Sequence, residues 1–456
     1  MLTWQDFPTD ESKIPEFIAQ MISEHERNKA VEMARTADLY DHQRNKTINE
    51  YVQKIYSSAG LAVQNYVASN NKIASNFFRR LNTQRCTYSL GNGVTFAKNT
   101  DAVKAKLGDT FDTEIYRAGY LALIHGVSFV FFNFDHIHVF PLTEFVPLWD
   151  ENDGSLRAGL RYWCIDRTKP TIAVLYTEDG YRRFKSESGN VKFAKDGEKR
   201  SYKQTISKAP ADAEPEVVAE ENYSRLPIVP LWGSRLHQST LVGLQQSIDS
   251  YDLIRSGFAN DLQDCAQIYW ILENYGGMND KDLQRFRDQI LLQHIAVADT
   301  TDGGAIKPYT QDVPYAARTA YLQTIRQDIY EDFGGFDTKA ISASNQTATA
   351  INSAYQPLDE NADDFENQLE TCIRSILGLI GVEDYPVFKR NRISNQTEQV
   401  QMVLQEAEYL DQQTILEKLP NITTDEVPKI LERTLEKAES RFIRADGNNT
   451  EGSGND

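Results

Sequence analysis

Cysteine is scarce in this sequence, and no hydrophobic run is long enough to cross a membrane. The four cysteines lie far apart along 456 residues, at Cys86, Cys164, Cys265 and Cys372. This spacing excludes a cysteine zinc site and a small disulfide framework, and favours buried thiols in a reducing compartment. The longest apolar run, residues 126–133, has the length of a strand, whereas a membrane helix needs about 20 apolar residues. The first residues show no basic region followed by an apolar one, so we expect no signal peptide and no membrane association.

Familiar catalytic motifs are also missing. The sequence has no phosphate-binding P-loop, no dinucleotide-binding glycine pattern, no nucleophile elbow and no His-Glu-x-x-His motif. His136 and His138 alternate along an expected strand and therefore face the same side. No third ligand stands at a recognisable spacing, so surface or interface histidines are favoured over a metal site. We expect no catalytic residue, no metal and no cofactor, while a hydrolase that uses scattered carboxylates stays open as an alternative.

Positive charge is in the minority. The chain has 48 lysines and arginines against 66 aspartates and glutamates, a formal net charge of −18 and a pI near 5.0. This balance excludes a protein that coats nucleic acid through overall positive charge. Hydrophobic residues make up 40% of the chain and aromatic residues 11%, enough to bury several cores and to exclude a disordered chain.

Carboxylates crowd one expected helix in the second half of the chain. They are Asp359, Glu360, Asp363, Asp364, Glu366 and Glu370. The glycine turn of a calcium loop is absent there, so a solvated or lumen-facing surface is favoured over a cation site. Residues 299–304 resemble a calcium loop only in composition and are interpreted as a turn.

Hydrophobic periodicity predicts a mixed α+β fold. In the first half, apolar spacing predicts helices near residues 13–22, from about 69, and over 108–126. Alternation and turn residues predict strands over 127–134, 137–142, 156–166, 171–178, 181–185 and 226–232. Residues 186–222 are poor in apolar side chains and are interpreted as an exposed excursion.

In the second half, two long helices flank a compact α/β insert. The helices are expected over 239–264, with Ser239 as N-cap, and over about 314–333. The insert is expected to contain strands 267–273, 295–298 and 305–309 and helix 280–293. A loop over 336–347 should precede a third long helix, 347–379, kinked at Pro357. A strand over 385–391, a helical segment over 395–445 and a disordered tail complete the expected order.

The polar faces of the two long helices lean acidic. Asp249 and Asp252 lie on the first helix, and Asp328 and Glu331 on the second, without a lysine or arginine stripe. A face that holds DNA tightly carries clustered positive charge, whereas a face that DNA slides past does not. An ordinary solvated helix surface explains the same charges equally well.

Several ordered segments carry a resemblance to a known family. They are residues 71–77 (NKIASNF), 88–96 (YSLGNGVTF), 116–130 (YRAGYLALIHGVSFV), 139–150 (VFPLTEFVPLWD), 226–232 (LPIVPLW) and 239–252 (STLVGLQQSIDSYD). In this order the chain resembles the portal proteins of tailed double-stranded DNA bacteriophages of the long-tailed, siphovirus type. The last two segments are the most specific, and the resemblance spans about residues 30–440.

The resemblance implies a multi-region α+β portal fold assembled as a ring. Its regions would be an N-terminal helical region (1–60), a wing (61–238), first and second stem helices (239–264 and 313–334), a clip (265–312), a channel loop (335–355), a long wing helix and strand (356–394), a helical crown (395–446) and a tail (447–456). Portals often carry a glycine where the loop joins the next helix, but residues 345–351 (NQTATAI) have none. The boundary of the loop therefore departs from the family pattern.

The resemblance also implies the function. A portal is a ring, of twelve copies in this family, at one capsid vertex, through which double-stranded DNA is packaged and ejected. The implied partners are the terminase large subunit, a head–tail adaptor and the major capsid and scaffolding proteins. The implied location is the virion, after assembly in the host cytoplasm. Another head–tail connector ring is an alternative, although adaptors are usually shorter than this chain.

Site residues follow from the implied regions. The channel loop would touch DNA phosphates non-specifically through Lys339, Ser342, Ser344, Asn345 and Gln346. The stem would present Asp249, Asp252, Asp328 and Glu331 to the channel. The clip would form the subunit and terminase interface through Tyr269, Trp270, Lys281, Arg285 and Arg287. Its strands would pair between neighbouring copies, because rings close by head-to-tail contacts and exposed strand edges attract further strands.

Overall fold

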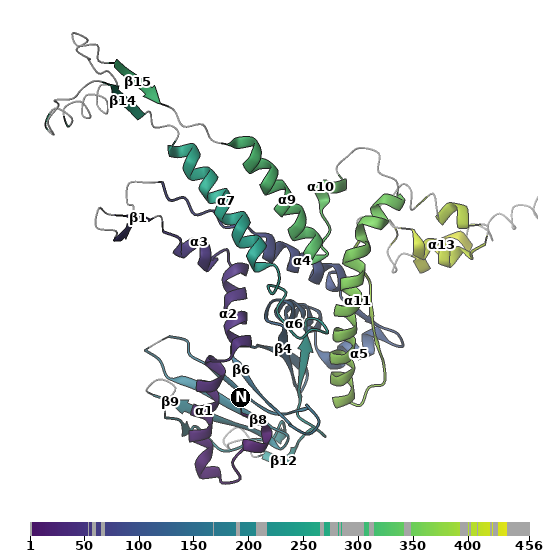
Figure 1. Cartoon of the computed structure of the whole chain (residues 1–456). Coiled ribbons are helices and arrows are strands. Elements are labelled where there is room, and N and C mark those ends of the chain that lie inside the picture. Colours follow the sequence, from purple (N-terminus) through teal and green to yellow (C-terminus); the bar gives the residue numbers. More distant parts are fainter. Residues whose placement is uncertain are drawn as a thin grey trace, which may run out of the picture. The chain divides into compact units, whose positions relative to one another are not determined.

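The computed structural model confirms a mixed fold of helices and several small antiparallel sheets (Figure 1). It divides into two compact units: residues 1–336 with 357–390, and residues 337–356 with 391–456. The structure describes residues 2–52, 54–56, 61–64, 69–166, 168–187, 192–206, 217–264, 269–273, 281, 284, 305–309, 314–341, 348–392, 400, 403–407, 409–419, 422 and 427–435.

A five-stranded antiparallel sheet packs against helix α1, near the N-terminus. The strand order is β10-β9-β8-β7-β6, formed by Ala194–Lys195, Gly180–Ser186, Thr171–Thr177, Leu156–Trp163 and Phe145–Trp149. Helix α1 (Ile14–Glu26) carries Pro15 in its first turn, where no backbone donor is needed, and buries its apolar stripe on this sheet. Ile18 and Ile22 are fully buried, and each such side chain contributes about 2 kcal/mol to stability. The strands expected over 156–185 are confirmed.

The second core joins a three-stranded sheet to two helices. The sheet has the order β13-β4-β5, formed by Ile228–Trp232, Val127–Asn133 and His136–Pro141. Helix α6 (Phe111–His125) and helix α11 (Ala348–Leu379) contribute to the same core. Strand β4 is buried from Val127 to Phe132, which explains its continuous apolar run. The predicted hairpin and helices are confirmed here, and α11 continues through Pro357.

The third core is helical and lies at the base of the two long helices. It joins α2 (Lys29–Asp41) and α4 (Phe77–Leu90) to α7 (Gln245–Asp264) and α9 (Tyr315–Phe333). Helix α7 begins six residues later than predicted, because Ser239 shapes a turn instead of capping the helix. Its hydroxyl donates to the Ile124 carbonyl (2.5 Å) and accepts from the Leu241 N–H (3.1 Å). Helix α4 also begins later than expected, after an extended segment over 69–76.

Two of the predicted strands of the insert are confirmed, and the region interpreted as an exposed excursion contains a strand pair that was not predicted. The insert contains β14 (Tyr269–Glu273) and β15 (Ala305–Tyr309), which form an antiparallel pair. The expected strand 295–298 and most of helix 280–293 lie outside the described residues, although Lys281 and Gln284 are helical. The excursion over 186–222 is not purely irregular, since β11 (Lys203–Ile206) pairs with β12 (Val217–Glu221). Every residue of β12 is exposed, as the composition predicted.

Short elements complete the described chain. They are the 3-10 helices η1 (Trp4–Asp6) and η2 (Glu11–Lys13), helices α3 (Lys46–Glu50), α5 (Thr100–Leu107), α10 (Thr338–Ile341) and α13 (Gln412–Lys418), and the strand pairs β1–β2 (Lys54–Tyr56, Ala62–Gln64) and β3–β16 (Val94–Phe96, Pro386–Phe388). Within the described residues, none of the helices has the length and hydropathy of a membrane span. Cys86 and Cys372 are buried as expected, Cys164 is exposed against expectation, and Cys265 lies outside the described residues.

Candidate functional site

Helices α7 and α9 run side by side in antiparallel directions (Figure 1). Near the third core their contact is apolar, through the buried Ile248 and Ile329. Farther out it becomes polar and aromatic. The Ser250 and Tyr321 hydroxyls lie 3.1 Å apart, the Phe258 and Tyr315 rings lie 5.7 Å apart, and Arg318 forms an ion pair with Asp261. The pair is thus anchored at one end and held by polar contacts along the rest.

A polar ridge on α7 binds the extended segment that precedes α4. Backbone N–H groups of residues 71, 73 and 75 donate to Asn260 Oδ1 (2.6 Å), Ser256 Oγ (3.0 Å) and Asp252 Oδ1 (2.9 Å). Four helical residues advance about 6 Å and two extended residues advance about 6.6 Å, so every second N–H meets every fourth side chain. The segment therefore satisfies its backbone donors on a helix, without a partner strand at these positions.

Asp252 is the buried end of this ridge. Its side chain is 0% exposed, and besides Ser75 it accepts a hydrogen bond from Asn45 Nδ2 (2.7 Å). Burial raises the pKa of the Asp252 carboxyl to about 6, although the Ser75 hydrogen bonds act in the opposite direction. The hypothesis that Asp252 faces a channel is wrong, because its carboxylate is buried inside the protomer and accepts hydrogen bonds from Ser75 and Asn45.

The other three acidic stem candidates differ in exposure. Asp249 is half-buried and accepts from the Tyr40 hydroxyl (2.5 Å) and the Thr47 hydroxyl (2.9 Å), so it too has an internal role. Burial and this carboxylate together raise the pKa of Tyr40. Asp328 and Glu331 on α9 are exposed, with Glu331 accepting from Gln327 at 2.6 Å. Only these two of the four candidates leave an acidic face open to solvent.

The end of α9 is held in place by side chains of α4 and α11. Gly334 ends α9 in the left-handed region at φ +65°, and a Cβ there would lie 2.1 Å from Asn361 Nδ2. Asn361 itself donates to the Phe333 carbonyl at 3.0 Å. The Gln84 side chain binds both backbone groups of Phe336. Its Nε2 donates to the Phe336 carbonyl (2.9 Å), and its Oε1 accepts from the Phe336 N–H (3.0 Å). Sequence analysis missed Gln84, because only its contact with residues far along the chain reveals its role.

The predicted loop and clip residues are only partly described. Lys339 is exposed in α10, and its backbone N–H donates to Asp337 Oδ1 at 3.0 Å. Ser342, Ser344, Asn345 and Gln346 lie outside the described residues, as do Arg285 and Arg287. Tyr269 and Trp270 begin β14 opposite Tyr309 and Pro308 of β15, and Lys281 is exposed. The roles of all these residues stay predictions.

The acidic cluster on α11 is organised by one arginine. Arg390 forms ion pairs with Asp359 (3.1 Å) and Glu366 (2.9 Å) and also with Asp363. The hydrogen bonds that Arg390 donates to the Glu366 carboxylate, ahead of the other causes, raise the pKa of Arg390. Tyr88 donates to Asp359 at 2.6 Å. The interpretation of the cluster as a solvated or lumen-facing surface needs correction for these three carboxylates. They form ion pairs with Arg390, which lies beyond the helix in the sequence and partly neutralises them.

The two strand histidines lie together as predicted. His136 Nε2 and His138 Nε2 are 3.0 Å apart, and His136 Nδ1 lies 2.5 Å from Asp135 Oδ1. Burial lowers the pKa of His138 below its ordinary value, and the neighbouring His136 acts in the same direction. Across the described parts of the chain, no group of three or more side chains is arranged to hold a metal ion.

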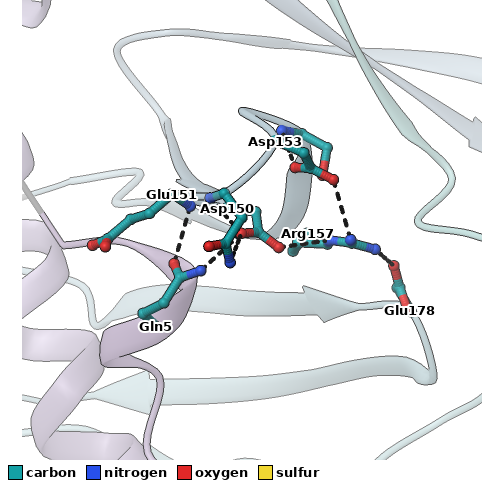
Figure 2. Close-up of polar contacts among 8 residues, drawn as sticks. Gln5, Asp150, Glu151, Asp153, Arg157 and Glu178 are labelled. Atoms are coloured by element: carbon teal, nitrogen blue, oxygen red, sulfur yellow. Dashed lines mark hydrogen bonds and ion pairs between the residues drawn. The ribbon is translucent and has the colours of Figure 1, made fainter.

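Arg157 organises a polar network that fastens the N-terminal segment to the first sheet (Figure 2). Its guanidinium bridges Asp150 (3.2 Å), Asp153 (3.3 Å) and Glu178 (3.3 Å). Gln5 donates to Asp150 Oδ1 at 2.7 Å and accepts from the Glu151 N–H at 3.1 Å. The network supports structure at the edge of the sheet and was not predicted from the sequence.

Comparison with known proteins decides the family. Residues 20–440 match the family described as "Phage portal protein, SPP1 Gp6-like". This chain belongs to that phage portal protein family. The family is structural rather than enzymatic, and the siphovirus-type resemblance seen in the sequence is confirmed.

Two curated relatives support this membership. The portal protein of Clostridium phage phiCD119 is 26% identical over 244 residues, which cover 51% of this chain and 53% of that protein. The match thus spans about half the length of that relative. The portal protein of Bacillus phage SPP1 is 22% identical over 382 residues, covering 77% of this chain and 73% of that protein.

Solved structures give weaker likenesses. The neck of an empty GTA particle aligns with a TM-score of 0.45 and 9% identity, over 75% of this chain and 89% of that one. The virion of a native gene transfer agent particle aligns with a TM-score of 0.44 and 10% identity, over 75% and 88%. Likenesses at this level carry no argument about assembly.

Proposed function

We propose that this portal family member forms a ring, of twelve copies, at one capsid vertex, through which double-stranded DNA is packaged and ejected. The observation that carries the proposal is the family match over residues 20–440. The antiparallel α7–α9 pair supports it, because a helix pair anchored at one end and followed at the other by the β14–β15 strand pair suits a stem and clip. The alternative of another connector ring fits the family match less well.

The charge of the chain fits a conduit rather than a DNA-binding protein. A net charge of −18 per chain and the exposed Asp328 and Glu331 oppose tight contact with a polyanion. Weak contact lets a duplex move in either direction, whereas strong phosphate contacts would resist both packaging and ejection. We propose that the chain contributes geometry and no catalysis, and that an external motor supplies the work.

The partners follow from the same proposal. The clip, with Tyr269, Trp270, Lys281, Arg285 and Arg287, would bind neighbouring copies and the terminase large subunit. A head–tail adaptor would replace the terminase after packaging, and capsid and scaffolding proteins would contact the wing. The loop residues Lys339, Ser342, Ser344, Asn345 and Gln346 would touch passing DNA. The ring would assemble in the host cytoplasm and end in the virion.

Electron microscopy of the purified full chain tests the ring. We expect particles of roughly 600 kDa with a central hole by negative stain, and the same mass by mass photometry, from twelve chains of 51.9 kDa. A matched assay for nucleotide and ester hydrolysis should show no turnover. A monomer or dimer that hydrolyses either substrate would instead favour the carboxylate hydrolase and overturn the proposal.

A further inference from the structure

The histidine pair on β5 has a geometry that the sequence did not predict. Strand β5 lies at the edge of its three-stranded sheet, and the turn residues 134–135 join it to β4. His136 and His138 alternate with the buried Ile137 and therefore share one face of the strand. His138 is exposed, and the His136 side chain is 38% exposed. Both imidazoles are thus held by a paired strand and remain accessible from solvent.

The two imidazole rings turn their outer nitrogens toward each other. His136 Nε2 and His138 Nε2 lie 3.0 Å apart, and the rings are inclined at 79°. A metal ion bonded to both nitrogens at about 2.0–2.1 Å would join them at an angle of about 94°. That angle matches two neighbouring positions of a square-planar or octahedral ion, whereas tetrahedral Zn²⁺ would need a nitrogen separation of about 3.3 Å. The observed spacing therefore suits Ni²⁺ or Cu²⁺ better than Zn²⁺.

Asp135 sets the tautomer of the first imidazole. Its Oδ1 lies 2.5 Å from His136 Nδ1, so Nδ1 carries the hydrogen and Nε2 keeps a lone pair. A carboxylate behind the imidazole is the usual second partner of a metal-binding histidine. Without an ion, the Nε2–H group of His138 donates to that lone pair. Because His138 is exposed, water can move this proton to Nδ1, which frees both Nε2 lone pairs with no net release of a proton.

The charges around the pair do not oppose a cation. Two arginines act electrostatically on His138, but each has a carboxylate partner. Arg117 pairs with Glu114 at 3.6 Å, and Arg161 pairs with Glu144 at 3.4 Å. Glu114 Oε2 is buried and accepts no hydrogen bond, and the Glu114 charge also acts on His138. With the aspartate of the turn added, three carboxylates face two arginines, so the surroundings of the pair carry a slight negative excess.

We propose that His136 and His138 form a two-histidine site for a divalent transition-metal ion, with Ni²⁺ and Cu²⁺ preferred and Asp135 orienting the first imidazole. Within the described residues no third side chain joins them, so water fills the remaining coordination positions. The hard cations Mg²⁺ and Ca²⁺ prefer oxygen ligands and are not bound here. Both ligands come from one strand of one chain, so the site does not depend on the proposed ring.

Calorimetric titration of the full chain with Ni²⁺ in a non-chelating buffer tests the site. We expect one ion per chain at this site, and no competition from Mg²⁺ in excess. His136→Ala and His138→Ala should each weaken binding about a hundredfold or more, because a single imidazole loses the gain from two linked ligands. Asp135→Asn keeps both ligands and should weaken binding about tenfold. His42→Ala is the matched control, because His42 is an exposed histidine at the end of α2; it should bind like wild type.

Electron paramagnetic resonance of bound Cu²⁺ counts the nitrogen ligands without relying on the folding of a histidine variant. The measurement uses Cys164→Ser, which removes an exposed thiol that would react with Cu²⁺. We expect hyperfine splitting from two nitrogens. A signal without nitrogen splitting, Ni²⁺ affinity unchanged in His138→Ala, or no binding of Ni²⁺ up to about 1 mM would overturn the proposal. The two imidazoles would then be a hydrogen-bonded pair and nothing more.

Discussion

At the residue scale, the most informative side chain is one whose position contradicts expectation. In the sequence, Asp252 resembled the other acidic residues of a helix surface. In the structure it is 0% exposed and accepts hydrogen bonds from the Ser75 N–H and the Asn45 side-chain amide. Its neighbours explain the difference, because the segment before α4 covers it and needs an acceptor there. Asp328, of the same residue type on the partner helix, is exposed.

Asp252→Asn should remove a pH dependence of stability. The folded pKa is raised from 3.8 to about 6, so the folded state holds this proton more tightly than the unfolded state. Wild type therefore loses stability relative to the variant as pH rises from about 4 to about 6, by on the order of 2–3 kcal/mol. Urea unfolding at several pH values measures this difference.

The amide should fit the site without a large penalty. Asn45 Oδ1 has no partner, so rotation of the Asn45 amide lets it accept from the new side chain. Asp252→Ala leaves the Ser75 N–H and Asn45 unpaired and should cost about 2–4 kcal/mol. Asp328→Asn is the exposed control and should keep the wild-type profile. Equal pH profiles for wild type and Asp252→Asn would refute the assignment.

At the element scale, the helix pair α7–α9 belongs to the folded cores, whereas the β14–β15 strand pair of the insert lies outside them. The three hydrophobic cores use residues of the sheets, α1, α2, α4, α6, α7, α9 and α11. The contact of Phe258 with Tyr315 places the outer ends of α7 and α9 close together, so a short linker can replace the insert. The insert is therefore expected to serve contacts between copies.

Deleting residues 266–310 and joining the helices with a glycine–serine linker should leave soluble, folded subunits. We expect a melting temperature close to that of the wild-type protomer and loss of stable rings, because the strands of the insert would no longer pair between neighbouring copies. Size-exclusion chromatography with light scattering measures the mass. A linker of equal length inserted in the exposed turn at Gly154 is the control. Unchanged rings after the deletion would show that the clip is dispensable for closure.

At the scale of the whole molecule, charge governs the encounter with DNA. The chain has a surplus of 18 negative charges, and each copy added to a ring adds the same surplus. A surface of this kind keeps a duplex weakly held, since tight binding depends on the release of counterions by lysine and arginine. The proposal of a conduit thus depends on the net charge of the whole chain rather than on any single contact with DNA.

Purified protein should bind a 30-base-pair DNA weakly, with a Kd of roughly 10 μM or more at 150 mM salt. Asp328→Lys combined with Glu331→Lys should tighten binding about tenfold or more and make it salt-sensitive, because both positions are exposed. The neutral pair Asp328→Asn with Glu331→Gln separates charge reversal from loss of charge. Fluorescence anisotropy over a salt series measures the affinity. Nanomolar binding by wild type would contradict a low-affinity conduit.

The sequence by itself determined the mixed fold, the order of elements and the family. Periodicity predicted α6, α9, α11 and the strands of both main sheets except β6 and β10, because burying one face imposes a repeat of 3.6 or 2 residues. The ordered segments from residue 71 to 252 carried the portal resemblance, which the family match confirmed.

Only the tertiary structure decided which polar residues face water. Asp252, Arg85 and Arg390 are charged residues of types that usually lie on the surface. In this structure, segments far away in the sequence cover them or pair with them. The starts of α4 and α7 also depended on such contacts, since the 71–75 backbone binds α7 side chains and Ser239 binds Ile124. Local periodicity contains no information about these partners, because burial and pairing are set by the packing of the whole chain.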